Sequence, residues 1–196
     1  GGGGGTPFCA LFGDCGGCAV QHMNDGTYDS WKRGLLVAAL ERQGLTAEAA
    51  LVGPLVRAHG PRRRAAFGLK VTRRGGLVGF NARRSHRLVD VPSCPLMDPE
   101  MSAVTDALRA ALPGLLPQGT GGEALIQKGL DGWDLSITAR PELTPTGRAR
   151  LGAMAEELDL CRVAWRHPDQ PPEPVALRRP PRVAVGALAV PLPPGA

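Results

Sequence analysis

The spacing of the cysteines places the strongest constraint on the fold of this 196-residue chain. Three of them, Cys9, Cys15 and Cys18, lie in one short N-terminal loop, and a fourth, Cys94, lies far along the chain. Thiolates grouped three plus one are typical of iron–sulfur ligation, in which several ligands share one loop and a remote residue completes the set. Such a site would staple the N-terminal loop to whatever part of the fold carries Cys94.

The glycines beside these cysteines favour the same interpretation. A chain that wraps a cluster tightly needs left-handed backbone angles, and Gly16 and Gly17 are expected to supply them and to leave their N–H groups facing sulfide. An all-cysteine zinc site is an alternative, although zinc ligands usually come as two closely spaced pairs. Unliganded or disulfide-forming cysteines are a third possibility. Residues 1–5 are a glycine run without the basic and apolar regions of a signal peptide, so we expect reduced thiols in a cytoplasm.

The remaining candidate ligands are expected to play no part in the metal site. Cys161 falls where a helix end runs into a buried strand, and there a free cysteine behaves as a small hydrophobic residue. His22 and His86 could bind metal in principle, but four thiols already complete a site.

The charge is strongly segregated along the chain. The net charge is +5, yet no Asp or Glu occurs between Glu48 and Asp90, and this window holds 10 of the 23 basic residues. Such segregation is a footprint for a polyanion, although a solvated basic face is the simpler reading. We expect contacts to a nucleic acid from one lysine and six arginines of this window: Arg62, Arg64, Lys70, Arg73, Arg74, Arg83 and Arg84.

The hydrophobic pattern predicts an α+β fold, with a mainly antiparallel sheet, flanking helices and an N-terminal iron–sulfur loop. Trp31 lies on an apolar helical stripe and is expected in the core. No stretch approaches the roughly 18 apolar residues of a membrane span, so we expect a soluble protein. Helices are expected at residues 28–43, 98–112 and 144–158, and strands at 62–72, 77–80, 87–91, 125–127, 133–138, 162–166, 174–177 and 182–190.

The ordered motifs resemble the uracil-5 RNA methyltransferases, and more narrowly their cluster-containing branch that modifies large-subunit ribosomal RNA. The resemblance rests on the cysteine loop with Gln21 and His22, on the Tyr28–Trp31–Lys32 segment, on the arginine strand at 62–64, and on the segment from Val78 to Cys94. It implies that Cys9, Cys15, Cys18 and Cys94 ligate an architectural [4Fe-4S] cluster. It also implies ribosomal RNA as the partner and a monomeric, cytoplasmic protein.

The resemblance further implies S-adenosylmethionine as methyl donor in the full-length enzyme. In that family a cysteine thiolate adds to C6 of uracil and a carboxylate removes the C5 proton. Both residues are expected beyond residue 196, so no catalytic residue is assigned here and the chain alone is predicted to be inactive. We therefore expect a flexible start at residues 1–8, a central iron–sulfur and RNA-recognition domain at 9–178, and a proline-rich lead into an absent methyltransferase domain at 179–196.

Two other functions are compatible with the same sequence features. A stand-alone RNA-binding module with a structural metal would share the cysteines and the basic window. A redox protein would share the cysteines alone, but such proteins seldom need ten cations in one segment.

Overall fold

The computed structural model describes residues 4–57 and 60–195. The chain divides into two compact units, the first made of Gly1–Gly13 and Cys18–Gly60 and the second of Asp14–Gly17 and Pro61–Ala196.

The first unit contains two helices, α1 (Asp25–Arg42) and the short α2 (Thr46–Ala50). The helix expected at residues 28–43 is therefore present, but its cap is Asn24, whose side-chain oxygen accepts a hydrogen bond from Thr27 N at 2.9 Å. The expectation that Trp31 lies in the core is wrong, since no residue of α1 is buried and Trp31 is 38% exposed. The five-residue α2 packs on α1 but is too short to cover its apolar stripe.

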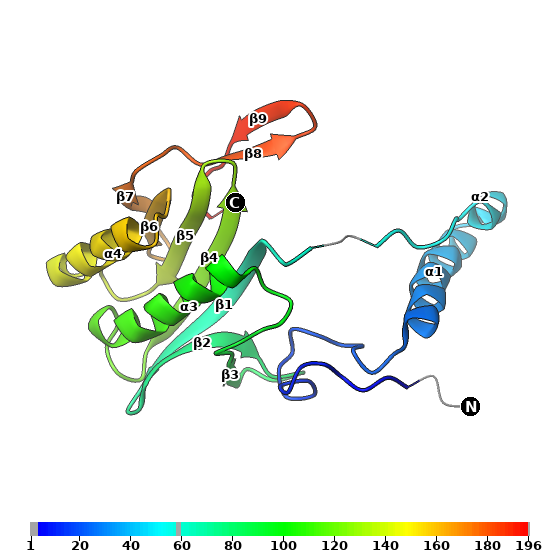
Figure 1. Ribbon diagram of the computed structural model, residues 1–196, viewed down its shortest axis with the longest axis horizontal. Helices are drawn as coiled ribbons and strands as arrows, with labels where there is room; N and C mark the ends of the chain where they lie inside the picture. Colours follow the sequence, from blue (N-terminus) through cyan, green and yellow to red (C-terminus); the bar gives the residue numbers. More distant parts are fainter. Residues whose placement is uncertain (1–3, 58–59, 196) are drawn as a thin grey trace. The chain divides into compact units, whose positions relative to one another are not determined.

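The second unit is built on a seven-stranded sheet with the order β3-β2-β1-β4-β5-β6-β7 in the described part of the chain (Figure 1). Every pair of neighbours is antiparallel except β5 and β6, which are parallel and joined through helix α4. The predicted α+β class is confirmed. The strands are β1 (Arg64–Thr72), β2 (Gly75–Asn81), β3 (Leu88–Asp90), β4 (Gly121–Gly129), β5 (Gly132–Ala139), β6 (Arg162–Arg166) and β7 (Glu173–Leu177).

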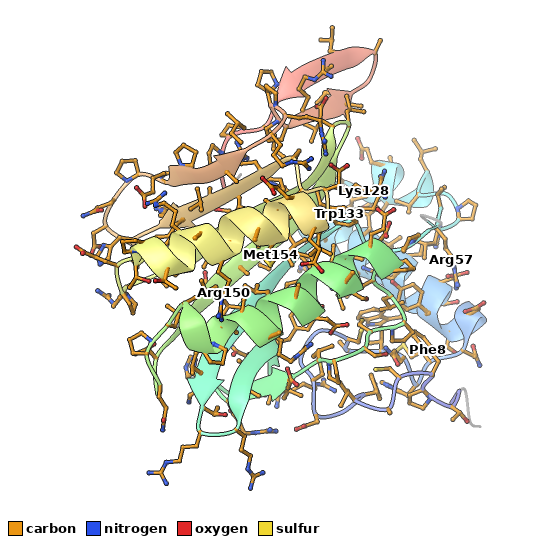
Figure 2. All side chains as sticks on the ribbon, turned by 60° about the vertical axis from the view of Figure 1, so that its left-hand side comes forward. Phe8, Arg57, Lys128, Trp133, Arg150 and Met154 are labelled. Atoms are coloured by element: carbon orange, nitrogen blue, oxygen red, sulfur yellow. The ribbon has the colours of Figure 1, made fainter. Side chains whose placement is uncertain are left out.

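Two helices, α3 (Pro99–Ala111) and α4 (Pro145–Glu157), lie on the same face of this sheet (Figure 1). Each begins where the sequence predicts, because Asp98 and Thr144 cap the first turns and a proline follows each cap. A 3-10 turn, η1 (Leu112–Gly114), extends α3. Met154 and Arg150 project from α4 toward α3 (Figure 2), so the helices cover the sheet as one layer.

The alternating pattern of β1 is confirmed residue by residue. Ala65, Phe67, Leu69 and Val71 are buried in the core, and the residues between them are exposed or half-buried. The single strand expected at residues 182–190 is a pair of strands, β8 (Arg182–Val185) and β9 (Leu188–Pro191). Gly186 takes a positive φ of 60° and turns the chain between them.

The sheet also contains a buried ion pair that the sequence analysis did not anticipate. Asp134 on β5 accepts two hydrogen bonds of 2.7 Å from the guanidinium of Arg162 on β6, and both side chains are almost fully buried. Gln127 on β4 donates to the same carboxylate at 3.2 Å. Arg162 also donates to the carbonyl oxygen of Leu192 at 2.9 Å, which anchors the chain after β9 to the sheet.

None of the helices in the described part of the chain has the length and hydrophobicity that a membrane crossing requires.

Candidate nucleic-acid interface

Most of the predicted RNA-binding side chains lie along the β1–β2 hairpin or in the segments next to it. Arg73 and Arg74 form the turn between β1 and β2, and both are exposed. Lys70 lies on β1 opposite Leu77 of β2. Arg83 and Arg84 follow β2 at the opposite end of the hairpin. The seven residues of β2 separate the two arginine pairs and span roughly 20 Å, so the cations are spread along the hairpin and do not meet at one point.

Six of these seven side chains are exposed and have no partner in the part of the chain that the structure describes. Arg64 differs, since its guanidinium donates to Gln127 Oε1 at 3.3 Å. Cations that are already solvated and unpaired can neutralise phosphates without breaking an internal contact. Among residues 4–57 and 60–195, no ion pair or side-chain hydrogen bond involves Arg62, Lys70, Arg73, Arg74, Arg83 or Arg84.

Two other arginines of the basic window are neutralised within their own units. Arg57 forms ion pairs with Asp25 at 2.9 Å and Asp29 at 2.6 Å, and these carboxylates raise the pKa of its guanidinium. Arg87 forms an ion pair with Asp14. The ten cations counted in the sequence therefore overstate the charge that the window offers to a polyanion.

The first unit holds Cys9 and Cys18, and its contacts explain the positions of Gln21 and His22, which follow the cysteine loop. The side-chain oxygen of Gln21 accepts a hydrogen bond from Cys9 N at 3.3 Å. The ring of His22 packs against Phe12 with centroids 5.8 Å apart. Gln21 and His22 thus shape the loop that carries the cysteines.

The second unit holds Cys15 and Cys94. Cys15 pairs with Ala82 in an isolated bridge, and Cys94 lies in the loop that follows β3. The role expected of the glycines is corrected here. Gly16 and Gly17 lack positive φ angles, and their N–H groups donate to Asn81 O and to Cys15 Sγ. Gly16 is required for another reason, because a Cβ there would lie 2.5 Å from Asn81 O.

The donor chemistry of these loops fits thiolate ligation. The four loop cysteines are half-buried and form no disulfide, whereas Cys161 is buried and its thiol donates to Trp133 O at 3.1 Å. Burial raises the pKa of the Cys161 thiol to about 11, which agrees with its predicted inert role. Within the described residues no three Cys, His, Asp or Glu side chains are grouped closely enough to hold a metal ion, so the four-cysteine site stays a prediction.

Comparison with known proteins identifies relatives along nearly the whole chain. An RNA methyltransferase of Brucella suis, described as uncharacterized, is 37% identical over 195 residues, which is 97% of this chain and 44% of that protein. The 23S rRNA (uracil(1939)-C(5))-methyltransferase RlmD of Aromatoleum aromaticum is 34% identical over 179 residues, covering 84% of this chain and 38% of that protein. The chain is a relative of the RNA methyltransferases. The family resemblance seen in the motifs is therefore confirmed, and the chain spans less than half the length of the curated relatives it matches.

The fold agrees with this relationship. The crystal structure of the Pyrococcus abyssi tRNA (uracil-54, C5)-methyltransferase in complex with S-adenosyl-L-homocysteine matches with a TM-score of 0.59 and 14% identity. The match covers 95% of this chain and 47% of that one. At this identity the likeness concerns the fold alone. A comparison with models of protein families finds no match.

Proposed function

We propose that this chain is the RNA-recognition portion of an S-adenosylmethionine-dependent methyltransferase that acts on C5 of a uracil in ribosomal RNA. The observation that carries the proposal is a set of six exposed cations in and next to the β1–β2 hairpin, which have no side-chain partner among the residues that the structure describes. The named relatives support the substrate class, since several are 23S rRNA uracil-C5 methyltransferases.

Salt-dependent RNA binding tests this role. Each phosphate contact to a single strand adds about −0.7 to the slope of log affinity against log salt. Arg73→Gln/Arg74→Gln should therefore make the slope shallower by about 1.4 and weaken binding to all sequences alike. Arg42→Gln/Arg140→Gln is the matched control, because both arginines are exposed, lie outside the hairpin and change the net charge equally. Binding that is absent, insensitive to salt, or equally affected by both double variants contradicts the proposal.

The same proposal includes an architectural [4Fe-4S] cluster held by Cys9, Cys15, Cys18 and Cys94. None of these four cysteines forms a disulfide, and all four are half-buried. When bound, the cluster would supply structural cross-linking and no electron, because methyl transfer from a sulfonium donor needs none.

Metal analysis of protein prepared without oxygen tests the cluster. We expect about four irons and four acid-labile sulfides per chain. Cys94→Ser should lose them, whereas Cys161→Ser, which alters a cysteine in the core, should keep them. Zinc in an amount equal to the protein would replace the cluster assignment with a zinc site.

We further propose that the 196 residues do not methylate RNA by themselves. They correspond to less than half of each relative, and the resemblance places the nucleophile and the base elsewhere. Incubation of the chain with ribosomal RNA and S-adenosylmethionine should yield no 5-methyluridine. Turnover in that assay would overturn this part of the proposal.

A further inference from the structure

A hollow of about 400 Å³ opens on the face of β1 that is turned away from α3 and α4. Its floor is the backbone around Gly68, where the outward side chains of β1 are small or absent. A Cβ at Gly68 would meet Leu88 Cδ1 at 2.7 Å, so the Leu88 side chain closes one side of the hollow. The volume falls in the range of sites that hold small organic ligands. The hollow lies entirely within the second unit.

The lining combines an apolar wall with side chains that can donate or accept hydrogen bonds. Leu88 provides the apolar contact, and the Asn81 amide and the His86 imidazole supply donors and acceptors. Lys70 and Glu123 complete the rim, and both are exposed. Neither forms an ion pair or a side-chain hydrogen bond with any residue the structure describes, so both groups remain available to a ligand.

The charge around the hollow indicates the class of ligand. Lys70 lies at its rim, Arg73 and Arg74 lie beyond one end of β1, and Arg83 and Arg84 follow β2 at the other end. A polyanionic strand that follows these cations along the hairpin passes over the hollow. Proteins read single-stranded RNA by placing unstacked bases in such sites and bonding their edges.

We propose that the hollow binds one unpaired RNA base that carries an exocyclic amino group, namely adenine, cytosine or guanine. A carboxylate accepts hydrogen bonds from the two N–H groups of an amino group, whereas uracil offers a single N–H flanked by two carbonyl oxygens that repel a carboxylate. Glu123 is the carboxylate on the rim. The proposal rests on the RNA-recognition role proposed above.

Short RNAs provide the test. The probes are a nine-nucleotide oligouridylate and the same strand whose central residue is adenosine, cytidine, guanosine or an abasic ribose. Fluorescence anisotropy on the 196-residue chain gives each dissociation constant. We expect at least one amino-bearing base to bind about tenfold more tightly than uridine or the abasic residue at that position.

Three variants separate the contributions. Ala66→Leu fills the hollow from an exposed position on its floor, and it should abolish the base preference while leaving affinity for the abasic probe and the salt slope unchanged. Thr138→Leu is the matched control, because it adds a similar side chain on the same face outside the hollow and should keep the preference. Glu123→Gln should bring uridine within about twofold of the best base, since an amide can also donate.

The outcomes distinguish this inference from the proposed function. Salt-dependent binding without any base preference, or a preference that survives Ala66→Leu, overturns the base site and leaves the RNA-recognition role intact. Absence of RNA binding overturns both. An equal loss of preference in Thr138→Leu also contradicts the assignment, because the effect would then not belong to the hollow.

Discussion

The buried pair of Asp134 and Arg162 predicts a large and specific loss of stability when one partner is removed. The side chains are 1% and 7% exposed, and two hydrogen bonds of 2.7 Å join them. Asp134→Ala leaves the guanidinium in the interior with the Leu192 carbonyl as its remaining partner. An uncompensated buried charge of this kind costs about 3–5 kcal/mol of unfolding free energy.

Removing both charges should largely reverse that loss. Asp134→Ala/Arg162→Met replaces the pair by apolar groups, so neither charge has to be desolvated on folding. We therefore expect the double variant to be more stable than Asp134→Ala. Asp169→Ala is the surface control, because Asp169 and Arg140 are 75% and 78% exposed and 3.9 Å apart. That variant should show no measurable change.

Urea unfolding followed by tryptophan fluorescence measures these differences. Trp133 and Trp165 report on the sheet, since they lie on β5 and β6 and are 5% and 3% exposed. A loss of less than about 1 kcal/mol in Asp134→Ala would refute the reasoning. A double variant as unstable as the single one would refute it as well, because the damage would then come from lost packing and not from an unpaired charge.

Three further predictions concern single residues. Hydrogen bonds from Arg179 and then Arg178 hold the pKa of Asp159 at about 2, below its ordinary 3.8, so its stabilising effect is present above about pH 4 and is lost as the pH falls toward 2. The stability difference between the wild type and Asp159→Asn should accordingly shrink across that range in acid titrations, and a constant difference would contradict the assignment. Iodoacetamide at about pH 8 should label Cys161 far more slowly than the four loop cysteines of metal-free protein, because its thiol is buried with a pKa of about 11; equal labelling in peptide mass spectra would contradict this. Thr144→Ala should cost about 1 kcal/mol in urea unfolding, since the hydroxyl caps α4, and a loss equal to that of Thr144→Ser would exclude the cap as its cause.

Local patterns in the sequence predict the sheet and its helices well. The alternation in β1 and the caps Asp98 and Thr144 depend on neighbouring residues, so the strand predicted at 62–72 and the helices predicted at 98–112 and 144–158 are found close to those positions. The apolar stripe of α1 wrongly predicted a buried helix face. A helix face is buried only where another element packs against it, and the periodicity of the sequence does not show whether such an element exists. The exposed Trp31 is the result.

The electrostatic partners are the part that local patterns miss. Arg87 pairs with Asp14, and Arg57 pairs with Asp25 and Asp29, all far away in sequence. The buried pair had one available signal, since Asp134 stands between Trp133 and Leu135 in a strongly apolar strand. A charge in that setting needs a partner, but only the pairing of β5 with β6 identifies Arg162.

The pairing of β1 with both β2 and β4 has a consequence for biosynthesis. During translation the hairpin of β1 and β2 emerges before α3 and β4, so one edge of β1 stays without its hydrogen-bonding neighbour until the ribosome has made residues 121–129. An open edge beside side chains destined for the core is a template for association with other nascent chains. The yield of native protein should therefore fall when translation pauses between α3 and β4.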